Sequence, residues 1–358
     1  MIFHYLKIAF RNLCKYKTQN VISIIGLAVG LLCFCVCIYC SRFVENTDHC
    51  FANHDRIAEL NLYDGKADRY FSGSPIPLAE ELRTWALGET EAISSVTYPR
   101  ERPYYVELSP EKTLPYELET IEIDTCYNKI FTPEMVAGHW KMASQSLNSV
   151  ILSQSMAIKI FGNAESAIGK HMTLMRRLNT SPESTPKTGG IVYTIQAVMK
   201  DISLNNSLDF MQNIDMLTVN DSEGLLQSPK RHNMTGANTY VLLSPQTTCT
   251  DLEKQFSKRD YTYTLYGEAY TVTASSMGAR LKKQGASYLG LVTGIIGTLI
   301  LLVGLINFFH FLIGSFFNRT KEYSIMKMIG CNWKQLFYLL FTQSLIVISI
   351  SSILVLSG

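Results

Sequence analysis

Three long runs without a charged residue constrain this chain more than any other feature. They cover residues 21–41, 285–318 and 335–358. A helix needs about 20 apolar residues to cross the roughly 30 Å hydrocarbon core of a bilayer, and each run is long enough. The first run is longer than the apolar part of a signal peptide and no small-residue cleavage site follows it, so we interpret it as a retained anchor. The sequence therefore predicts three membrane-spanning helices in contact with the lipid bilayer.

Basic residues beside these runs predict their orientation, because cytoplasmic loops are enriched in Lys and Arg. Two groups flank the runs: Lys7, Arg11, Lys15 and Lys17, and then Arg319, Lys321, Lys327 and Lys334. Both segments are therefore predicted to face the cytoplasm. Residues 44–284 then lie on the other side of the membrane.

The middle and the ends of the chain also differ in charge. Residues 44–284 hold 29 of the 30 acidic residues and 23 of the 32 basic ones, a net charge of −6, whereas the whole chain carries +2. The basic residues are dispersed in the middle and adjoin the apolar runs at the ends. This distribution is typical of a membrane protein and argues against nucleic-acid binding.

The first residues form two stripes at helical spacing. The basic stripe contains His4, Lys7, Arg11 and Lys15, and the apolar stripe contains Ile2, Leu6, Ala9 and Leu13. This pattern predicts an amphipathic helix on the inner leaflet over residues 1–17. The alternative is a charged flank that only sets the topology.

The exported segment has a mixed pattern of elements. Alternating and β-branched stretches predict strands, and a proline near one start and Ser153 before another stretch favour helices. The predicted strands are 104–108, 117–127, 149–152, 170–175, 191–199, 208–217, 239–243 and 269–273, and the predicted helices are 77–86, 154–161 and 250–258.

The predicted fold class is α+β: three transmembrane helices with a large mixed α/β extracytoplasmic domain, in which two subdomains are an alternative to one. The expected division is an interfacial helix at 1–17, a span at 18–43, the exported domain at 44–284, a span with a stalk at 285–317, a cytoplasmic loop at 318–334 and a span at 335–358. The alternative to the stalk is a short linker before a helix that starts near Tyr288.

Motifs for catalysis or cofactor binding are not found. The segment with Gly162, Gly169 and Lys170 lacks the glycine spacing and the Ser or Thr of a nucleotide-binding loop. His49, Cys50 and His54 are close in sequence, but no second cluster accompanies them. Cys50, Cys126 and Cys249 lie in the exported segment, where an odd count gives no complete disulfide framework. We therefore assign no catalytic, cofactor-binding or metal-binding residues and expect a non-enzyme.

Two pairs of glycines in the apolar runs point to close contacts between helices. Gly26 and Gly30 in the first run, and Gly290 and Gly294 in the second, are four apart, a spacing that lets helices approach closely. The alternative is that these glycines are merely tolerated, since glycine is common in membrane helices.

The segment between the second and third runs is short, charged and amphipathic. Ile325, Met328 and Ile329 share one face with Tyr323 nearby, Lys321, Glu322 and Lys327 offer polar contacts, and Gly330 is placed to end the helix. Such a helix is suited to insert its apolar face into a groove of a soluble partner. The alternative is an ordinary positively charged loop.

Several segments together resemble permease subunits of the MacB/FtsX-like ABC transporter family, particularly those of Bacteroidetes. They are "LKIAFRNLCKYKTQNVISIIGLAVGL", "DHCFANHDRIAEL", "VILSQSMAIKIFGNAESAIGKHMTL", "YTIQAVMKDISLNNSLDF" and "NRTKEYSIMKMIGCNWKQLFYLLFTQSL". The family usually has Arg where Met326 stands and Glu where Gln343 stands. Its repeat has four spans, so the resemblance implies a chain truncated after the third span, with a natural three-span protein as the alternative.

The resemblance implies a permease with a MacB-like periplasmic core domain in the cell inner membrane. Its partners would be a separate ABC ATPase subunit and a second permease copy or half, with a periplasmic adaptor or an outer-membrane protein as a further candidate. Movement of the periplasmic domain would serve efflux, lipoprotein extraction or mechanotransmission. The alternative function is a membrane-anchored sensor or an FtsX-like regulator of cell-wall hydrolases.

Overall fold

The chain divides into two compact units, each described here by itself. The helical unit comprises Met1–Asn46 and Gln284–Gly358, and the sheet unit is Thr47–Lys283. The computed structural model describes residues 11, 15, 17–71, 73–85, 87–109, 112–174, 190–208, 211, 213–221, 224–227, 235–279, 286–318 and 320–357. Most of the interfacial helix predicted for residues 1–17 lies outside the described residues.

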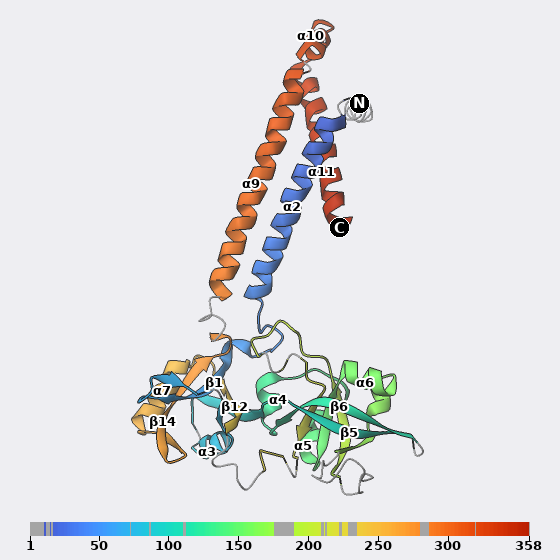
Figure 1. Cartoon of the computed structure of the whole chain (residues 1–358). Helices are drawn as coiled ribbons and strands as arrows, with labels where there is room; N and C mark the ends of the chain where they lie inside the picture. Colours follow the sequence, from blue (N-terminus) through green and yellow to red (C-terminus); the bar gives the residue numbers. More distant parts are fainter. Residues whose placement is uncertain are drawn as a thin grey trace. The chain divides into compact units, whose positions relative to one another are not determined.

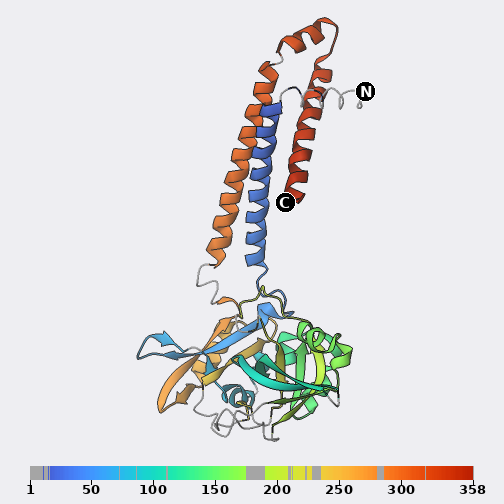
Figure 2. The same cartoon turned by 45° about the vertical axis from the view of Figure 1, so that its right-hand side comes forward.

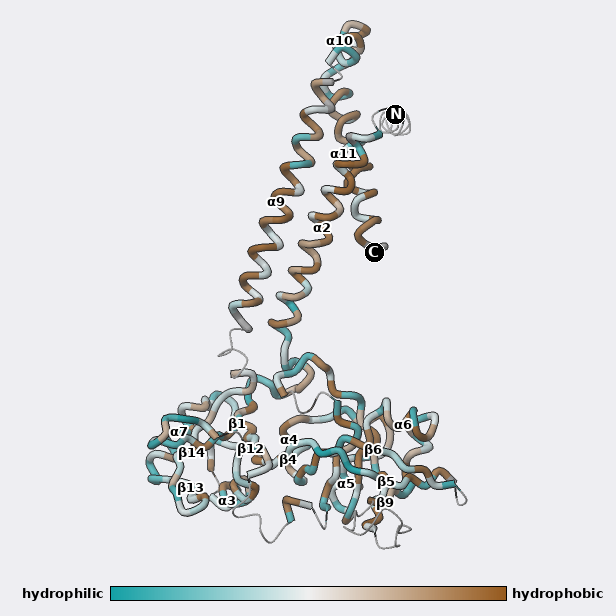
Figure 3. Tube along the Cα trace, viewed as in Figure 1, coloured by the Kyte–Doolittle hydropathy of each residue, from teal (hydrophilic) through white to brown (hydrophobic). Residues whose placement is uncertain are grey.

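The helical unit contains three helices that are long and apolar enough to cross a membrane. They are α2 (Lys17–Glu45), α9 (Ala286–Asn318) and α11 (Trp333–Ser357). The short helix α10 (Thr320–Met328) lies between α9 and α11 along the chain. Figure 3 shows the long helices coloured brown along most of their length. Because α9 continues for 33 residues, it is about 50 Å long. Helix α9 begins at Ala286, two residues before the start near Tyr288 that the linker alternative gave, and residues 284 and 285 lie outside the described part.

Helices α2 and α9 run side by side in opposite directions (Figures 1 and 2). Their backbones approach each other closely at Gly30 of α2 and Gly304 of α9. Helix α11 packs on both, and a small core of Leu27, Phe308, Phe311 and Val347 lies between the three. The hydroxyl of Ser351 in α11 also donates a 3.1 Å hydrogen bond to the carbonyl oxygen of Ile24 in α2.

The sheet unit is built around one continuous network of paired strands. Its longer strands are β1 (Ile57–Asp64), β4 (Thr90–Thr97), β5 (Arg100–Ser109), β6 (Lys112–Ile123), β8 (Ser149–Ser153), β10 (Val192–Met199), β12 (Thr235–Leu243) and β14 (Glu268–Ser276). The short ones are β2 (Arg69–Tyr70), β3 (Ser74–Pro75), β7 (Met135–Gly138), β9 (His171–Leu174), β11 (Met216–Val219) and β13 (Thr262–Leu265).

The strand order produces a closed ring and an open arm. Strands β11, β8, β10, β9, β5 and β6 follow one another, and β6 pairs back with β11 in parallel, which closes the ring. Strands β4, β12, β1, β14 and β13 form the arm. Val96 of β4 opposite Ile123 of β6 joins arm to ring.

Helices cover the faces of these strands. The arm carries α3 (Leu78–Arg83) and α7 (Cys249–Lys258), and α4 (Tyr127–Phe131), α5 (Trp140–Gln145) and α6 (Gln154–Phe161) belong to the ring and its junction with the arm. Strand β12 is buried on both faces. Tyr240 and Leu242 enter a core shared with Ile121 of β6, whereas Val241 and Leu243 enter the core under α3 and α7. The predicted fold class, apolar spanning helices with a large mixed α/β domain, is confirmed.

The predicted helices and most of the predicted strands of the sheet unit are observed, whereas α4 and α5 were not predicted. The stretch 154–161 is helical as predicted, and the Ser153 hydroxyl accepts a hydrogen bond from the Met156 N–H as its N-cap. The predicted strand at 117–127 is wrong at its end, because β6 stops at Ile123 and Tyr127 begins α4. The predicted strand at 208–217 is wrong over most of its length, since β11 begins only at Met216.

Candidate functional site

The short helix α10 has one apolar face that is covered by its own chain. Tyr323 is 7% exposed, and its ring stacks on that of Phe316 in α9 with 5.5 Å between the ring centroids. Leu336 and Leu339 of α11 are buried in the same cluster, and Met326 packs against it. The buried position of Tyr323 separates it from Ile325, Met328 and Ile329, near which the sequence pattern placed it.

The opposite face of α10 is apolar and exposed. Ile325 is 52% exposed, Met328 79% and Ile329 82%. Trp333, the first residue of α11, is also exposed and was not singled out by the sequence. We call Ile325 and Met328 of α10, together with Ile329 in the turn directly after it, the exposed face of α10. Contiguous exposed apolar side chains of this kind mark surfaces that bind a partner or a membrane.

The charged residues of the loop have different surroundings. Glu322 forms an ion pair with Lys15, with 2.8 Å between Oε1 and Nζ. The Nζ of Lys327 lies 4.6 Å from the ring centroid of Trp333, a cation–π contact. Lys321 is exposed.

The end of α10 is defined by Gly330, as its position in the sequence predicts. Gly330 has φ +97°, a backbone conformation that favours glycine. Its N–H donates to the carbonyl of Lys327, and the N–H of Cys331 donates to that of Met326. These two bonds form a Schellman motif. The side chain of Gln335 then accepts from the N–H of Asn332 at the start of α11.

The glycines predicted for helix packing are in different surroundings. A Cβ on Gly30 would lie 3.3 Å from the Cα of Gly304, and one on Gly26 would lie 2.3 Å from Nδ2 of Asn307. Both therefore lie where α2 and α9 approach closely. A Cβ on Gly290 would make ordinary contacts with Ser41 and Val44 at 3.8 Å.

Gly294 differs from the other three, since among the described atoms none lies within 4 Å of a Cβ built there. The close contacts of α9 instead involve Gly297 and Gly304. A Cβ on Gly297 would lie 2.5 Å from that of Cys37. Spacing of seven residues places Gly297 and Gly304 on one side of a helix, a signal that a search for glycines four apart does not detect.

The sheet unit contains a polar cavity that sequence reasoning missed. Its volume is about 300 Å³, and it is lined by residues of α3, β4 and β6 and of the segment after β11. The lining residues are Ile76, Glu80, Arg83, Ser95, Glu122, Ile123, Asp124, Thr125, Asn220, Asp221, Leu226 and Gln227.

Like Asp221, which is 1% exposed, Glu122 is a buried carboxylate of this cavity, at 5% exposure. Its two oxygens accept hydrogen bonds from the N–H groups of Leu225 at 2.6 Å and Leu226 at 2.9 Å. Gly224 has no room for a side chain, because a Cβ there would lie 2.1 Å from Oε1 of Glu122. Burial raises the pKa of Glu122 to about 7, with a further contribution from the nearby Asp221, although the two N–H donors oppose this.

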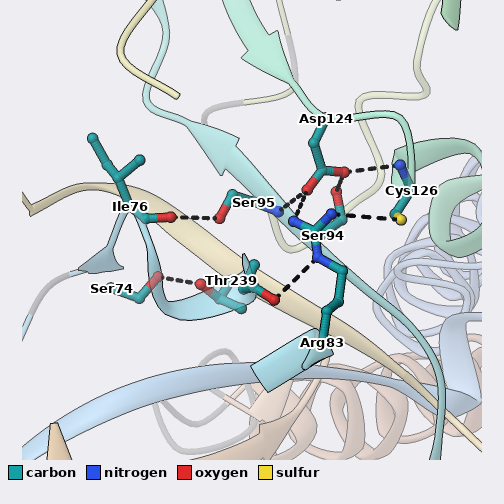
Figure 4. Close-up of polar contacts among 9 residues, drawn as sticks. Ser74, Ile76, Arg83, Ser94, Ser95, Asp124, Cys126 and Thr239 are labelled. Carbon is teal, nitrogen blue, oxygen red and sulfur yellow. Dashed lines mark hydrogen bonds and ion pairs between the residues drawn. The ribbon is translucent and has the colours of Figure 1, made fainter. Parts of the chain in front are cut away.

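Asp124 joins the arm to the ring at the edge of the same cavity (Figure 4). One oxygen accepts from the Ser94 hydroxyl and the Cys126 N–H, and the other from the Ser95 N–H at 3.0 Å and from Arg83 at 2.9 Å. Four donors from three elements therefore converge on one carboxylate. Such an arrangement stabilises the junction, because each donor would otherwise lose its partner in a partly buried site.

His49, Cys50 and His54, which are close in sequence, do not form a metal site among the described residues. The rings of His49 and His54 lie 4.4 Å apart between centroids, tilted by 38°, and Nδ1 of His54 contacts the carbonyl of Phe51. Within the described residues, no group of three His, Cys, Asp or Glu side chains is placed to hold a metal. Cys50, Cys126 and Cys249 are free thiols, and burial raises the pKa of Cys50 and Cys249.

Comparison with known proteins gives a family match for the C-terminal part of the chain. Residues 294–358, which include most of α9 and all of α10 and α11, match the FtsX-like permease C-terminal family. The family resemblance predicted from the sequence is thereby confirmed over this segment. No curated protein matches the chain.

Several solved structures are similar to this chain, and three of them are described here. A domain of a putative permease protein from Porphyromonas gingivalis has 20% identity and a TM-score of 0.46, and the match covers 63% of this chain and 93% of that one. The periplasmic region of MacB from Actinobacillus actinomycetemcomitans has 14% identity and a TM-score of 0.42, over 66% and 94%. The extracellular domain of the noncanonic ABC-type transporter YknZ from Gram-positive bacteria has 13% identity and a TM-score of 0.36, over 61% and 99%.

Proposed function

We propose that this FtsX-like permease component is the membrane subunit of an ABC transporter and that α10 is the surface on which a separate ATPase subunit docks. The observation that carries the proposal is the two-sided packing of α10. One face is held by α9 and α11, whereas Ile325, Met328 and Ile329 are exposed. An anchored helix with an exposed apolar face suits insertion into a groove of a soluble partner.

The ion pair between Lys15 and Glu322 supports a common side for the N-terminal segment and α10. Both segments are basic, so the rule for cytoplasmic loops assigns them to the cytoplasm. In our proposal the chain crosses the inner membrane three times and the sheet unit lies in the periplasm.

The connections of the chain favour transmission of movement to the sheet unit. Helix α2 ends at Glu45, next to Thr47, where the sheet unit begins. The close approach of Gly30 to Gly304 packs α2 against α9, so displacement of one helix would displace the other. ATP binding by the partner would pull these helices and move the sheet unit, in efflux, lipoprotein extraction or mechanotransmission. A second permease copy or half would complete the membrane assembly.

The proposal is tested with a double variant of the exposed face. Ile325→Asp with Met328→Asp should abolish co-purification of the ATPase subunit or uncouple its hydrolysis, because two carboxylates would be buried without partners in the groove. Leu147→Asp with Leu204→Asp is the matched control, since both side chains are exposed and lie in the sheet unit. Unchanged binding and unchanged coupling in the α10 variant would refute the proposal. A permease that copurifies with no ATPase at all would favour the sensor alternative.

A further inference from the structure

The covered face of α10, which carries Tyr323, takes no part in the proposed docking. Tyr323 is the residue of α10 that lies in a buried cluster with residues of two other helices. Its ring stacks on Phe316 near the end of α9, at an interplanar angle of 29°. Leu336 and Leu339 bring the beginning of α11 to the same cluster. Tyr323, with Met326 packed on the same cluster, therefore holds α10 against the helices before and after it.

Both ends of α10 are also tied to the chain around it. At its start, the Thr320 hydroxyl donates a 2.6 Å hydrogen bond to the carbonyl of Phe317 in α9. At its end, the bond from the Cys331 N–H to the Met326 carbonyl turns the chain back, so that Cys331 and Met326 pack on the cluster around Tyr323. The cluster therefore continues from the last turns of α9 to the first turns of α11.

The packing of Tyr323 decides how stiff α10 is. A helix of nine residues is marginal in water without tertiary contacts. The Lys15–Glu322 pair is exposed, and exposed ion pairs contribute little to stability. Burial of an aromatic side chain contributes more to stability than an exposed ion pair. The ring of Tyr323 therefore contributes more to holding α10 in place than the Lys15–Glu322 pair does.

We propose that Tyr323 is a positioning residue that makes α10 a rigid continuation of α9 and α11. The inference rests on the proposed function and adds how force passes from the docking surface into the membrane helices. With the ring in place, displacement of the exposed face displaces α9. Without the ring, the same displacement is absorbed by movement of α10 relative to α9.

The first test measures amide hydrogen exchange of residues 320–329 in the full chain in lipid nanodiscs, with no ATPase present. Tyr323→Ala should exchange at least about tenfold faster, because loss of a buried aromatic side chain lowers the free energy of local opening. Tyr323→Phe keeps the stacked ring and should restore slow exchange. Met328→Ala is the matched control on the exposed face and should exchange like the wild type. Equal exchange in Tyr323→Ala and the wild type overturns the proposal.

The second test uses the complex with the ATPase subunit. Tyr323→Ala should weaken ATPase binding by less than about threefold, because α10 remains mostly helical, yet lose the ATP-dependent change in trypsin sensitivity of the sheet unit. Tyr323→Phe should retain that change. An ATP-dependent change that persists in Tyr323→Ala overturns the proposal. If Tyr323→Ala does not accumulate, Tyr323→Leu removes the ring stacking and retains an apolar side chain, and the same outcomes apply.

The two tests separate this inference from the proposed function. If the wild-type chain binds no ATPase, the proposed function fails, and with it the role of Tyr323 in coupling. The exchange experiment still decides whether Tyr323 holds α10 in place. If the ATPase binds and the exchange is unaffected by Tyr323→Ala, docking stands and the positioning role is wrong.

Discussion

The free energy of unfolding of the sheet unit should depend less on pH in Glu122→Gln than in the wild type. The pKa of Glu122 is raised from 4.5 to about 7, first because the group is buried and then because Asp221 lies near it. Arg102, paired with Asp221 across 3.6 Å, acts in the opposite direction, as do the N–H groups of Leu225 and Leu226. Glu80, Arg83 and Asp124 line the same cavity.

The sign of the effect follows from proton binding. Between about pH 4.5 and 7, the folded state holds a proton on Glu122 that the unfolded state has lost, so stability falls as the pH rises. A difference of roughly 2.5 pKa units at 1.36 kcal/mol per unit corresponds to about 3 kcal/mol between pH 4.5 and pH 8. The contribution is therefore present at low pH and lost as the pH passes 7.

The assay is denaturant unfolding of the full chain in detergent, followed by the fluorescence of Trp85 and Trp140 in the sheet unit. Trp333→Phe removes the signal of the helical unit. The free energy of unfolding of the wild type minus that of Glu122→Gln should fall by about 3 kcal/mol from pH 4.5 to pH 8. The constant cost of placing an amide group against the two N–H donors cancels in this comparison. Glu117→Gln, an exposed carboxylate on the same strand, controls for the loss of a charge.

A parallel pH dependence in the wild type and Glu122→Gln would show that burial does not govern the protonation of Glu122. The reasoning would then be refuted even if the variant were less stable at every pH. Such a constant difference would report only the lost hydrogen bond.

Three further predictions concern topology, helix packing and the junction of arm and ring. In a cysteine-free background with the outer membrane opened, a cysteine in place of Lys327 should be protected from an impermeant thiol reagent and one in place of Ser184, outside the described residues, should react. The reverse labelling would invert the topology. Gly30→Leu should weaken packing of α2 on α9, measured as loss of thermal stability in detergent, whereas Gly294→Leu should not. Equal stability of the two variants would contradict the role of the close contact. Asp124→Ala leaves four donors without their acceptor and should destabilise the sheet unit by about 3 kcal/mol in denaturant unfolding. A loss below about 1 kcal/mol would show that water replaces the carboxylate.

Features that depend on neighbouring residues in the sequence were predictable without the structure. Length and the lack of charge are enough to identify α2, α9 and α11, because a helix in lipid satisfies its own backbone hydrogen bonds. The N-cap Ser153 and the terminal Gly330 act within one turn of their helices. The FtsX-like segment at residues 294–358 is likewise a continuous stretch.

The interior strands of the sheet unit were harder to predict. Strand β4 has the polar sequence "TEAISSVT", but Ser94 and Ser95 are buried because Asp124 accepts hydrogen bonds from both residues. Their partner is about 30 residues away along the chain. No periodicity within β4 could therefore reveal that it is a buried strand.

The candidate sites show the same division. The spacing in α10 placed Tyr323 near Ile325, Met328 and Ile329, and only the packing of its ring against Phe316 separates the covered Tyr323 from the exposed Ile325. Glu122 follows Glu117 and Glu119 in a strand with repeated acidic residues, and nothing local distinguishes it. The sequence by itself determined which segments are apolar enough to span a membrane and where their helices end. The pairing of β6 with β11 and the segment 224–226 after β11 bury Glu122, because its carboxylate is covered by residues about 100 positions away along the chain.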